Sequence, residues 1–288
     1  MPWLTARKSL RARDCVIEAF RQYFKRNGHL QAFPMIAEMY GINKCHGLSS
    51  EEAVKMEMAT SLAMLSSGAN TAFWFVFQIF SDVDALHTVR EELLAVTSVS
   101  QTNLTHAPDT RVLRLDRISS ACPNFVALLN ETFRYHSTVI NIKKVKHDTI
   151  LDKKFLLKKN GIVMIPGQSL HHNKDTWGPD ADTFKHERFL SPGSKKNLGN
   201  TSAFRPFGAG ISMCPGRHFS TNVILGLVAM VVLQYEILPL EGKWIAPTKR
   251  SADLWNAMPK PDWDISVQLV KRSENTNTQW RFLWGEES

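Results

Sequence analysis

The chain has 288 residues, of which 43% are hydrophobic and 22% charged, and its formal net charge is +8. This length allows one large or two small globular domains with a sizeable core. The basic residues lie in short runs without interleaved aromatic residues, which excludes a nucleic-acid-binding pattern. They indicate either solvated loops or a surface that meets an anionic membrane or an acidic redox partner.

The four cysteines are Cys15, Cys45, Cys122 and Cys214. They form no Cys-x-x-Cys pair, and no His/Cys cluster has the spacing of a zinc site. The first residues lack the apolar region of a secretory signal peptide. We therefore expect an intracellular, reducing setting rather than a disulfide framework.

The N-terminal part of the chain predicts helices. Residues 7–25 form a basic amphipathic pattern that Asn27-Gly28 can end. Residues 29–47 look irregular. Ser49 is a good N-cap for the helix that follows, with Glu52 at the capping-box distance.

That next segment contains no charged residue between Met58 and Ser81. A helix over 51–81 would be about 46 Å long, and an uncharged run of this length is typical of a membrane span. The polar cluster Ser66–Thr71 in its middle argues against a span. It predicts instead a helix that bulges and presents Thr71 to a ligand.

Two further helices are predicted over 82–96 and from Pro123 to about 135, separated by a polar loop over 98–110. The second contains Glu131 and Arg134, which share a helix face at i and i+3. Taken alone, such a pair is a surface ion pair of little energetic value.

The C-terminal half also predicts strands. Residues 155–157 and 162–165 flank Asn160-Gly161, a strong hairpin-turn signal. After Leu233 the chain turns to short extended pieces over 235–240 and 265–269. We expect the polar tail over 271–288 to be frayed.

Cys214 lies just past a glycine-rich loop and just before an apolar segment, at the predicted N-terminus of a buried helix. The helix dipole and the free N–H groups of the first turn favour the thiolate there. Gly208, Gly210 and Gly216 allow the backbone to pass close to a flat ligand, and Phe207 offers an apolar wall. A buried thiolate needs a cationic partner such as a metal centre. The alternative is a buried free cysteine beside a turn.

The spacing Phe207-x-x-Gly210-x-x-x-Cys214-x-Gly216 resembles the haem-binding loop of the cytochrome P450 family. In that family the cysteine is the proximal ligand of the haem iron. The resemblance implies a mainly α fold with small β-sheets (α+β) whose N-terminal portion is missing. It also implies a single domain over 1–288, the C-terminal haem-binding half.

Other motifs follow in the family's order. Gly68, Asn70 and Thr71 match the end of its distal-helix motif, which implies catalytic roles for Thr71 and Asn70 in organising water and delivering protons. Most members carry an acid where this chain has Asn70, and an amide cannot ionise. Asparagine at this position is typical of the branch that contains sterol hydroxylases and prostacyclin synthase.

Glu131, Arg134 and Arg188 match the family's buried Glu-Arg-Arg network, which braces the cysteine loop. The resemblance places Lys143 where many members bind a haem propionate through an arginine. Ser212 stands where most members have a second propionate-binding residue, and Arg205 is the candidate to compensate for it.

The implied activity is that of a haem-thiolate monooxygenase that binds haem b through Cys214 and takes electrons from an NADPH-dependent reductase. It would oxidise a lipophilic small molecule such as a sterol, a terpenoid or another secondary metabolite, in association with the endoplasmic-reticulum membrane. Two alternatives stay open: a haem-thiolate isomerase or dehydratase that needs no reductase, and a catalytically inactive truncated paralogue. Membrane contact through residues 58–81 is a further open alternative.

Overall fold

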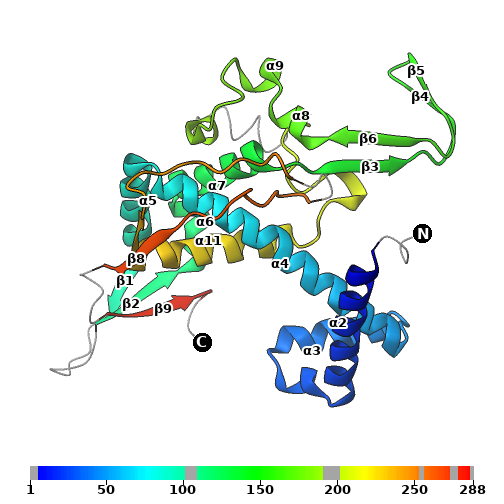
Figure 1. Ribbon diagram of the computed structural model, residues 1–288, viewed down its shortest axis with the longest axis horizontal. Helices are drawn as coiled ribbons and strands as arrows, with labels where there is room; N and C mark the ends of the chain where they lie inside the picture. The colour runs from blue at the N-terminus through cyan, green and yellow to red at the C-terminus, as the bar shows by residue number, and fades with distance from the viewer. Residues whose placement is uncertain (1–5, 101–108, 191–201, 253–255, 273–277, 286–288) are drawn as a thin grey trace. The chain divides into compact units, whose positions relative to one another are not determined.

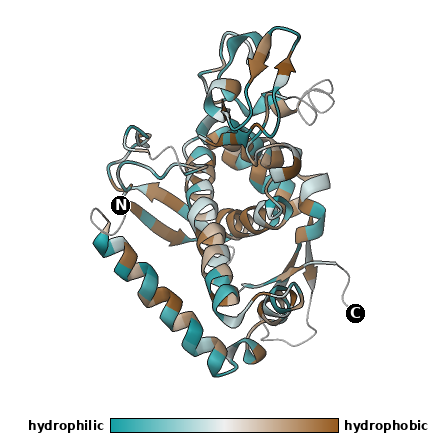
Figure 2. Cartoon of the chain, turned by 90° about the vertical axis from the view of Figure 1, so that its right-hand side faces the viewer, coloured by the Kyte–Doolittle hydropathy of each residue, from teal (hydrophilic) through white to brown (hydrophobic). Residues whose placement is uncertain are grey.

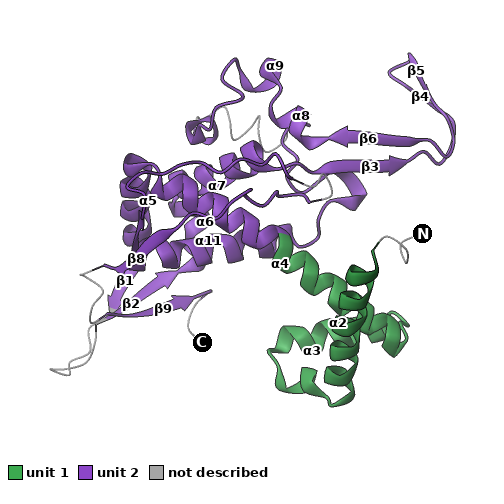
Figure 3. Ribbon diagram, viewed as in Figure 1, with its two compact units in different colours: residues 1–66 green, residues 67–288 purple. Residues whose placement is uncertain are grey.

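The computed structural model describes the chain except for residues 1–5, 101–108, 191–201, 253–255, 273–277 and 286–288 (Figure 1). The chain divides into two compact units, residues 1–66 and 67–288 (Figure 3). The resemblance implied a single domain over 1–288. Residues 1–66 enclose a small apolar cluster of their own, and the single domain over 1–288 stays a prediction.

The first unit is helical and consists of α2 (Arg7–Lys25), η1 (Gly28–Gln31), α3 (Pro34–Cys45) and the beginning of α4 (Ser50–Phe80). The prediction for α2 is confirmed, and Figure 2 shows hydrophilic and hydrophobic stretches alternating along this helix. Its apolar side packs Ile17 and Phe24 against Val54. The irregular segment predicted over 29–47 is wrong: Pro34 starts α3, since the first turn of a helix tolerates a residue without an N–H.

The predicted capping box opens α4. The Ser49 backbone N–H donates to Glu52 Oε2 at 2.9 Å, and the Glu52 N–H donates to Ser49 Oγ at 3.3 Å. The helix then continues without a break to Phe80, so the predicted bulge is wrong. The Thr71 hydroxyl donates to the Ser67 carbonyl at 2.7 Å, which satisfies a polar side chain inside a regular helix.

The second unit is built on helices with short connections (Figure 1). Besides the remainder of α4, its helical elements are α5 (Val83–Ala95), α6 (Leu115–Ala121), α7 (Pro123–His136), α8 (Gly167–His171), α9 (Lys174–Trp177), η2 (His186–Phe189), η3 (Gly210–Ser212) and α11 (Arg217–Gln234). Its main core joins residues of α4, α5, α6, α7 and α11, with Phe75, Leu93, Leu128 and Val228 almost fully buried. The mainly α fold class is confirmed.

Helix α7, which carries Glu131 and Arg134, is fixed at its beginning by α5. Glu92 accepts hydrogen bonds from the backbone N–H groups of Asn124 and Phe125, at 2.9 and 3.0 Å. A carboxylate at this point satisfies N–H groups that lack a partner within the helix and complements the helix dipole.

Small sheets complete the unit. β1 (Thr97–Ser100) pairs antiparallel with β2 (Asp109–Arg114), which pairs parallel with β9 (Thr278–Leu283). The other sheets are the antiparallel pairs β3 (Ile140–Lys144) with β6 (Ile162–Pro166), β4 (Thr149–Leu151) with β5 (Phe155–Leu157), and β7 (Tyr235–Pro239) with β8 (Val267–Lys271).

Three strand predictions need correction. The hairpin predicted around Asn160-Gly161 is wrong, because β5 pairs with β4 across a turn at Asp152-Lys153 whose two φ angles are 51° and 54°. The loop predicted over 98–110 begins and ends in paired strands, and its middle lies outside the described residues. The tail predicted to fray contains β9, which is held by the ladder to β2.

Within the described residues, α11 is the one helix whose length and hydropathy would allow it to cross a membrane. Its buried residues, among them Ile224, Leu225, Val228 and Val232, belong to the core of the second unit. The uncharged half of α4 does not meet the same test, and its Trp74, Phe75 and Ile79 lie in the same core.

Candidate functional site

The loop before α11 is closed by its own backbone. The Cys214 N–H donates to the Phe207 carbonyl at 2.9 Å, and the Met213 N–H donates to the Gly210 carbonyl at 3.0 Å. Gly208 and Gly210 have φ angles of 80° and 68°, in the region that favours glycine. The loop is therefore a compact turn that presents Cys214 at its end.

Cys214 lies at the start of α11, as predicted: the helix begins at Arg217 and Gly216 is its N-cap. The cysteine is free and partly exposed, and a Cβ built on Gly216 would lie 3.9 Å from its Sγ. Cys122 differs, because burial first and the nearby Glu92 carboxylate second raise the pKa of its thiol to about 12. Of these two thiols, only Cys214 is accessible to a ligand.

Strand β3 supports the loop from the side. Asn141 Oδ1 accepts a hydrogen bond from the Ala209 N–H at 3.1 Å, and the buried Asn141 Nδ2 has no hydrogen-bond partner. The Lys143 ammonium donates to the Ala209 carbonyl at 3.3 Å and also to the Ser212 hydroxyl. The structure thus brings Lys143 to the cysteine loop, where Ser212 is one of its partners.

Phe207 and Arg205 lie on the same loop. The Phe207 ring meets the Phe133 ring of α7 edge to face, with centroids 5.0 Å apart, so it links the loop to the core. For Arg205, the recorded contact is made by its backbone N–H, which donates to His171 Nε2 at 3.0 Å.

Glu131, Arg134 and Arg188 come together in the interior. Arg134 binds Glu131 through two hydrogen bonds of 2.7 Å, and both side chains are fully buried. Arg188 Nε lies 3.6 Å from Glu131 Oε1. The Lys185 backbone N–H donates to the same carboxylate oxygen at 2.8 Å. A bidentate arginine fork of this kind needs a guanidinium group, which lysine cannot replace.

The network also holds the backbone of the segment before the cysteine loop. Arg134 donates to the carbonyls of His171, Ala181 and Thr183 at 2.6, 2.8 and 3.2 Å. Arg188 donates to the Trp177 carbonyl at 2.7 Å and to Asp180 Oδ1 at 2.8 Å. The Arg188 guanidinium is the first cause that holds the pKa of Asp180 below its usual range.

Sequence reasoning missed His171, which connects this network to the cysteine loop. Its carbonyl accepts from Arg134 and its ring accepts from the Arg205 N–H. Burial and, second, the Arg134 charge lower the pKa of His171 to about 4, so the ring is neutral and Nε2 can accept. The only sequence signal is the pair His171-His172 after a strand, which is too common to single out.

Asn70 and Thr71 lie on the regular part of α4. Thr71 is buried and bonded within the helix, whereas Asn70 Nδ2 donates to the Met258 carbonyl at 2.9 Å. Trp74 Nε1 donates to the neighbouring Pro259 carbonyl at 2.8 Å. The Thr138 hydroxyl donates to the Asn256 carbonyl at 2.7 Å. Residues 256–259 are therefore tied to both α4 and the end of α7.

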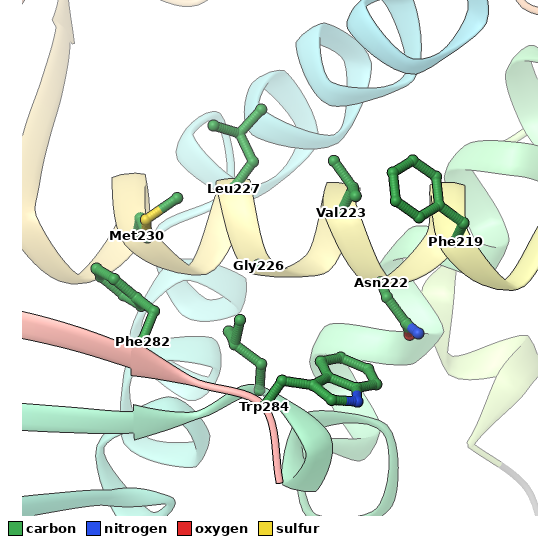
Figure 4. A pocket seen from close by; sticks show the side chains of 9 residues that line it. Phe219, Asn222, Val223, Gly226, Leu227, Met230, Phe282 and Trp284 are labelled. Atoms are coloured by element: carbon green, nitrogen blue, oxygen red, sulfur yellow. The ribbon is translucent and has the colours of Figure 1, made fainter. Parts of the chain in front are cut away.

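A separate pocket of about 470 Å³ lies along α11, with Phe282 and Trp284 on its other side (Figure 4). Its lining is apolar apart from Asn222 and the Trp284 indole, and it does not include Cys214. The pocket contains no titratable side chain and so offers no group for acid–base catalysis. Within the described residues, no cluster of three or more His, Cys, Asp or Glu is arranged to hold a metal ion.

Comparison with known proteins identifies the family. The sequence profile described as Cytochrome P450 matches residues 35–262. The cytochrome P450 monooxygenase nodJ of Hypoxylon pulicicidum is 31% identical over 288 residues, which cover 98% of this chain and 56% of that protein. Cholesterol 7-alpha-monooxygenase of Cricetulus griseus is 30% identical over 198 residues, which cover 63% of this chain and 39% of that enzyme. This chain thus spans about half the length of the curated relatives or less.

The fold agrees with the profile. A crystal structure of a cytochrome P450 superposes with a TM-score of 0.62 and 23% sequence identity, over 78% of this chain and 46% of the other. Because the profile covers well over half of the sequence, and the cysteine loop and the Glu131–Arg134–Arg188 network lie within it, this chain belongs to the cytochrome P450 family.

Proposed function

We propose that this chain carries the haem-binding half of a haem-thiolate monooxygenase. In this proposal it binds haem b through Cys214, receives electrons from an NADPH-dependent reductase and oxidises a lipophilic small molecule. The observation that carries the proposal is the partly exposed Cys214 thiol at the end of a loop that β3, α7 and the His171 ring all hold in place.

The residues present fit a haem group. Cysteine thiolate is a soft ligand suited to haem iron, and the Cys214 thiol is free and partly exposed. The unpartnered Asn141 Nδ2 and the Lys143 ammonium supply hydrogen-bond donors beside the loop. We propose that Lys143 holds a haem carboxylate as a point charge.

The chemistry that haem supplies when it is bound to a thiolate is the activation of dioxygen. The chain's own residues position and protect the site. Glu131, Arg134 and Arg188 fix the backbone that supports the cysteine loop, while Phe207 anchors the loop on the Phe133 ring. Thr71 is proposed to hold water and pass a proton through its hydroxyl, once that hydroxyl exchanges its bond to the Ser67 carbonyl.

Asn70 gives a second candidate function some weight. Its amide donates to the Met258 carbonyl and cannot transfer a proton by ionising. This favours a haem-thiolate isomerase or dehydratase, which has less need of proton delivery. Turnover of an endoperoxide or hydroperoxide without NADPH would support that candidate, and strict dependence on NADPH would reject it.

The substrate class and the location rest on the relatives. Cholesterol 7-alpha-monooxygenase is named for a sterol, and this supports a sterol or another lipophilic metabolite as the substrate class here. We propose association with the endoplasmic-reticulum membrane, as the resemblance to the cytochrome P450 family implies. The reductase is inferred from the monooxygenase names of the relatives.

The test is the carbon-monoxide difference spectrum of the reduced chain after reconstitution with haem, for wild type and for the Cys214→Ala variant. We expect the red-shifted Soret band of thiolate ligation in the wild type and its loss in the variant. Cys45→Ala is the matched control, because it removes an exposed thiol from the first unit. Survival of the band in Cys214→Ala would refute the ligand assignment, and failure of the wild type to take up haem would refute the proposal for this chain.

A further inference from the structure

The pocket along α11 is formed by three elements of the second unit (Figure 4). α11 supplies most of its lining, Leu115 of α6 adds to it, and Phe282 and Trp284 face α11 from β9 and from the residue beyond its end. α11 and α6 meet at Gly226, where a Cβ would lie 3.5 Å from Leu115 Cδ2. The volume of about 470 Å³ falls within the range of ~300–1,000 Å³ that is usual for small-molecule sites.

Part of the apolar lining is exposed to solvent. Phe219, Val223 and Leu227 recur at every fourth residue of α11 and are 43%, 49% and 45% exposed. On the other side of the pocket, Trp284 is 60% exposed. Single exposed apolar residues are common on protein surfaces, whereas several gathered around one concave site indicate a place where another molecule binds.

Two polar groups lie at the same end of this pocket. Asn222 and Trp284 are on the side of the α11 N-terminus, whereas Met230 and Phe282 lie towards the other end (Figure 4). Within the described residues, neither the Asn222 amide nor the Trp284 indole N–H has a hydrogen-bond partner. A ligand can therefore bind both groups without breaking a hydrogen bond inside the protein.

The lining also limits the charge of the ligand. It contains no aspartate, glutamate, lysine, arginine or histidine side chain. An ionised head group placed there would lose water without gaining a counter-ion, which is costly. A neutral hydroxyl group can instead accept a hydrogen bond from the Trp284 N–H and donate one to the Asn222 side-chain oxygen.

We propose that this pocket binds a neutral, lipophilic small molecule with a hydroxyl group at one end, such as a long-chain alcohol. A second protein chain is a less suitable occupant, because its backbone would bring many polar groups to a lining that offers only two partners for them. The lining includes neither Cys214 nor any residue of α4, so this site is separate from the site of the proposed oxidation. The inference therefore goes beyond the proposed function and does not depend on haem binding.

The experiment is equilibrium dialysis of the full 288-residue chain against 1-decanol, decanoate or butylbenzene, with haem and without it. We expect 1-decanol to bind, and decanoate to bind at least about tenfold more weakly because its carboxylate is ionised at neutral pH. Added haem should not displace 1-decanol, because the pocket does not include Cys214. Failure of the chain to take up haem would refute the proposed function alone, since dialysis without haem still tests the pocket.

Three variants locate the bound alcohol. Trp284→Ser should weaken the binding of 1-decanol and of butylbenzene by at least about tenfold, because it removes an aromatic wall of the pocket. Asn222→Leu should weaken the binding of 1-decanol about fivefold and leave butylbenzene, which has no hydrogen-bonding group, unaffected. Trp263→Ser is the matched control and should change neither affinity, because Trp263 is an exposed tryptophan that does not line the pocket.

Several outcomes would overturn the inference. Equal affinities of the Trp284→Ser and Trp263→Ser variants for 1-decanol would do so, as would displacement of the alcohol by haem, which would place it at the cysteine loop. Binding of decanoate as tight as that of 1-decanol would refute the neutral class of ligand. A wild-type dimer that Trp284→Ser dissociates, measured by sedimentation velocity, would assign the pocket to a second copy of this chain instead.

Discussion

The cysteine loop and the middle of α4 carry the two sets of proposed active-site residues, and they are held in different ways. Around the loop, Arg134 alone joins a buried carboxylate to three backbone carbonyls of the segment that precedes the loop. On α4, Thr71 is bonded only to its own helix, and Asn70 makes a single link to Met258. The cysteine loop is therefore supported by several contacts, whereas Asn70 and Thr71 lie on a regular helix and share one hydrogen bond to another segment.

The contrast has a physical reason. A loop that must hold a metal ligand in one orientation needs several independent contacts, so that its geometry does not depend on a single one. Residues proposed to handle water and protons need side chains that can exchange partners, and the Thr71 hydroxyl can do so without disturbing the helix backbone. The difference predicts that mutations in the Glu131–Arg134 network destabilise the fold strongly, while mutations of Asn70 and Thr71 act weakly on stability.

The largest effect should come from Arg134. Replacement with Leu leaves Glu131 buried without its partner, and we expect a loss of about 3–5 kcal/mol in the free energy of unfolding. Arg134→Lys should recover little of this, because lysine cannot make the two-pronged contact. Urea denaturation followed by tryptophan fluorescence measures the loss, since seven of the eight tryptophans lie in residues 67–288.

The control for Arg134 is Lys154→Leu, which removes an exposed ion pair to Asp152 within the same unit. Its effect should be close to zero. If Arg134→Leu were no more costly than this control, the network would not brace the cysteine loop.

His171 should give a smaller effect that depends on pH. Its folded-state pKa is about 4 against an ordinary value of 6.5, so the unfolded chain binds more protons between these values. The stability is therefore complete above about pH 6.5 and is lost as the pH falls towards 4, by about 2 kcal/mol between pH 7 and pH 5. Urea midpoints at the two pH values measure it.

His171→Gln provides the comparison, because a glutamine amide oxygen can accept from the Arg205 N–H without titrating. This variant should lose less stability on acidification than the wild type. The free energy of unfolding of this variant should still depend on pH, because burial and, second, the Lys249 charge also lower the pKa of His136. An unchanged pH dependence would show that His171 is not a source of the loss of stability in acid.

The sequence predicts those features that depend on residues close together in the chain. The capping box at Ser49 and the helix over residues 7–25 depend on neighbouring residues only, and both are confirmed. The profile match supports the family, and the cysteine loop and the Glu131–Arg134 pair lie inside it. Motifs of fixed spacing were thus recognised without knowledge of the packing.

The missed features depend on partners far along the chain. β9 is a strand only because β2 lies beside it, and its own sequence is polar enough to predict a frayed tail. The Asn160-Gly161 turn separates β5 from β6, but these strands pair with β4 and β3 and not with each other. The turn residues alone do not determine which strands pair. His171 and Arg205 are 34 positions apart in the sequence, and Asn70 and Met258 are 188 positions apart. No local pattern reveals contacts over such separations.

The smallest effect should come from Asn70. Asn70→Leu leaves the Met258 carbonyl without its donor, and the expected loss is about 1 kcal/mol in the free energy of unfolding, because one partly exposed hydrogen bond is removed. Asn222→Leu is the control, since Asn222 is also on a helix but lines the apolar pocket on α11. Asn70→Asp should resemble Asn70→Leu near neutral pH, because an ionised carboxylate cannot donate to a carbonyl. If Asn70→Leu cost as much as Arg134→Leu in the same urea experiment, α4 would be braced as firmly as the cysteine loop, and the contrast between the two regions would fail.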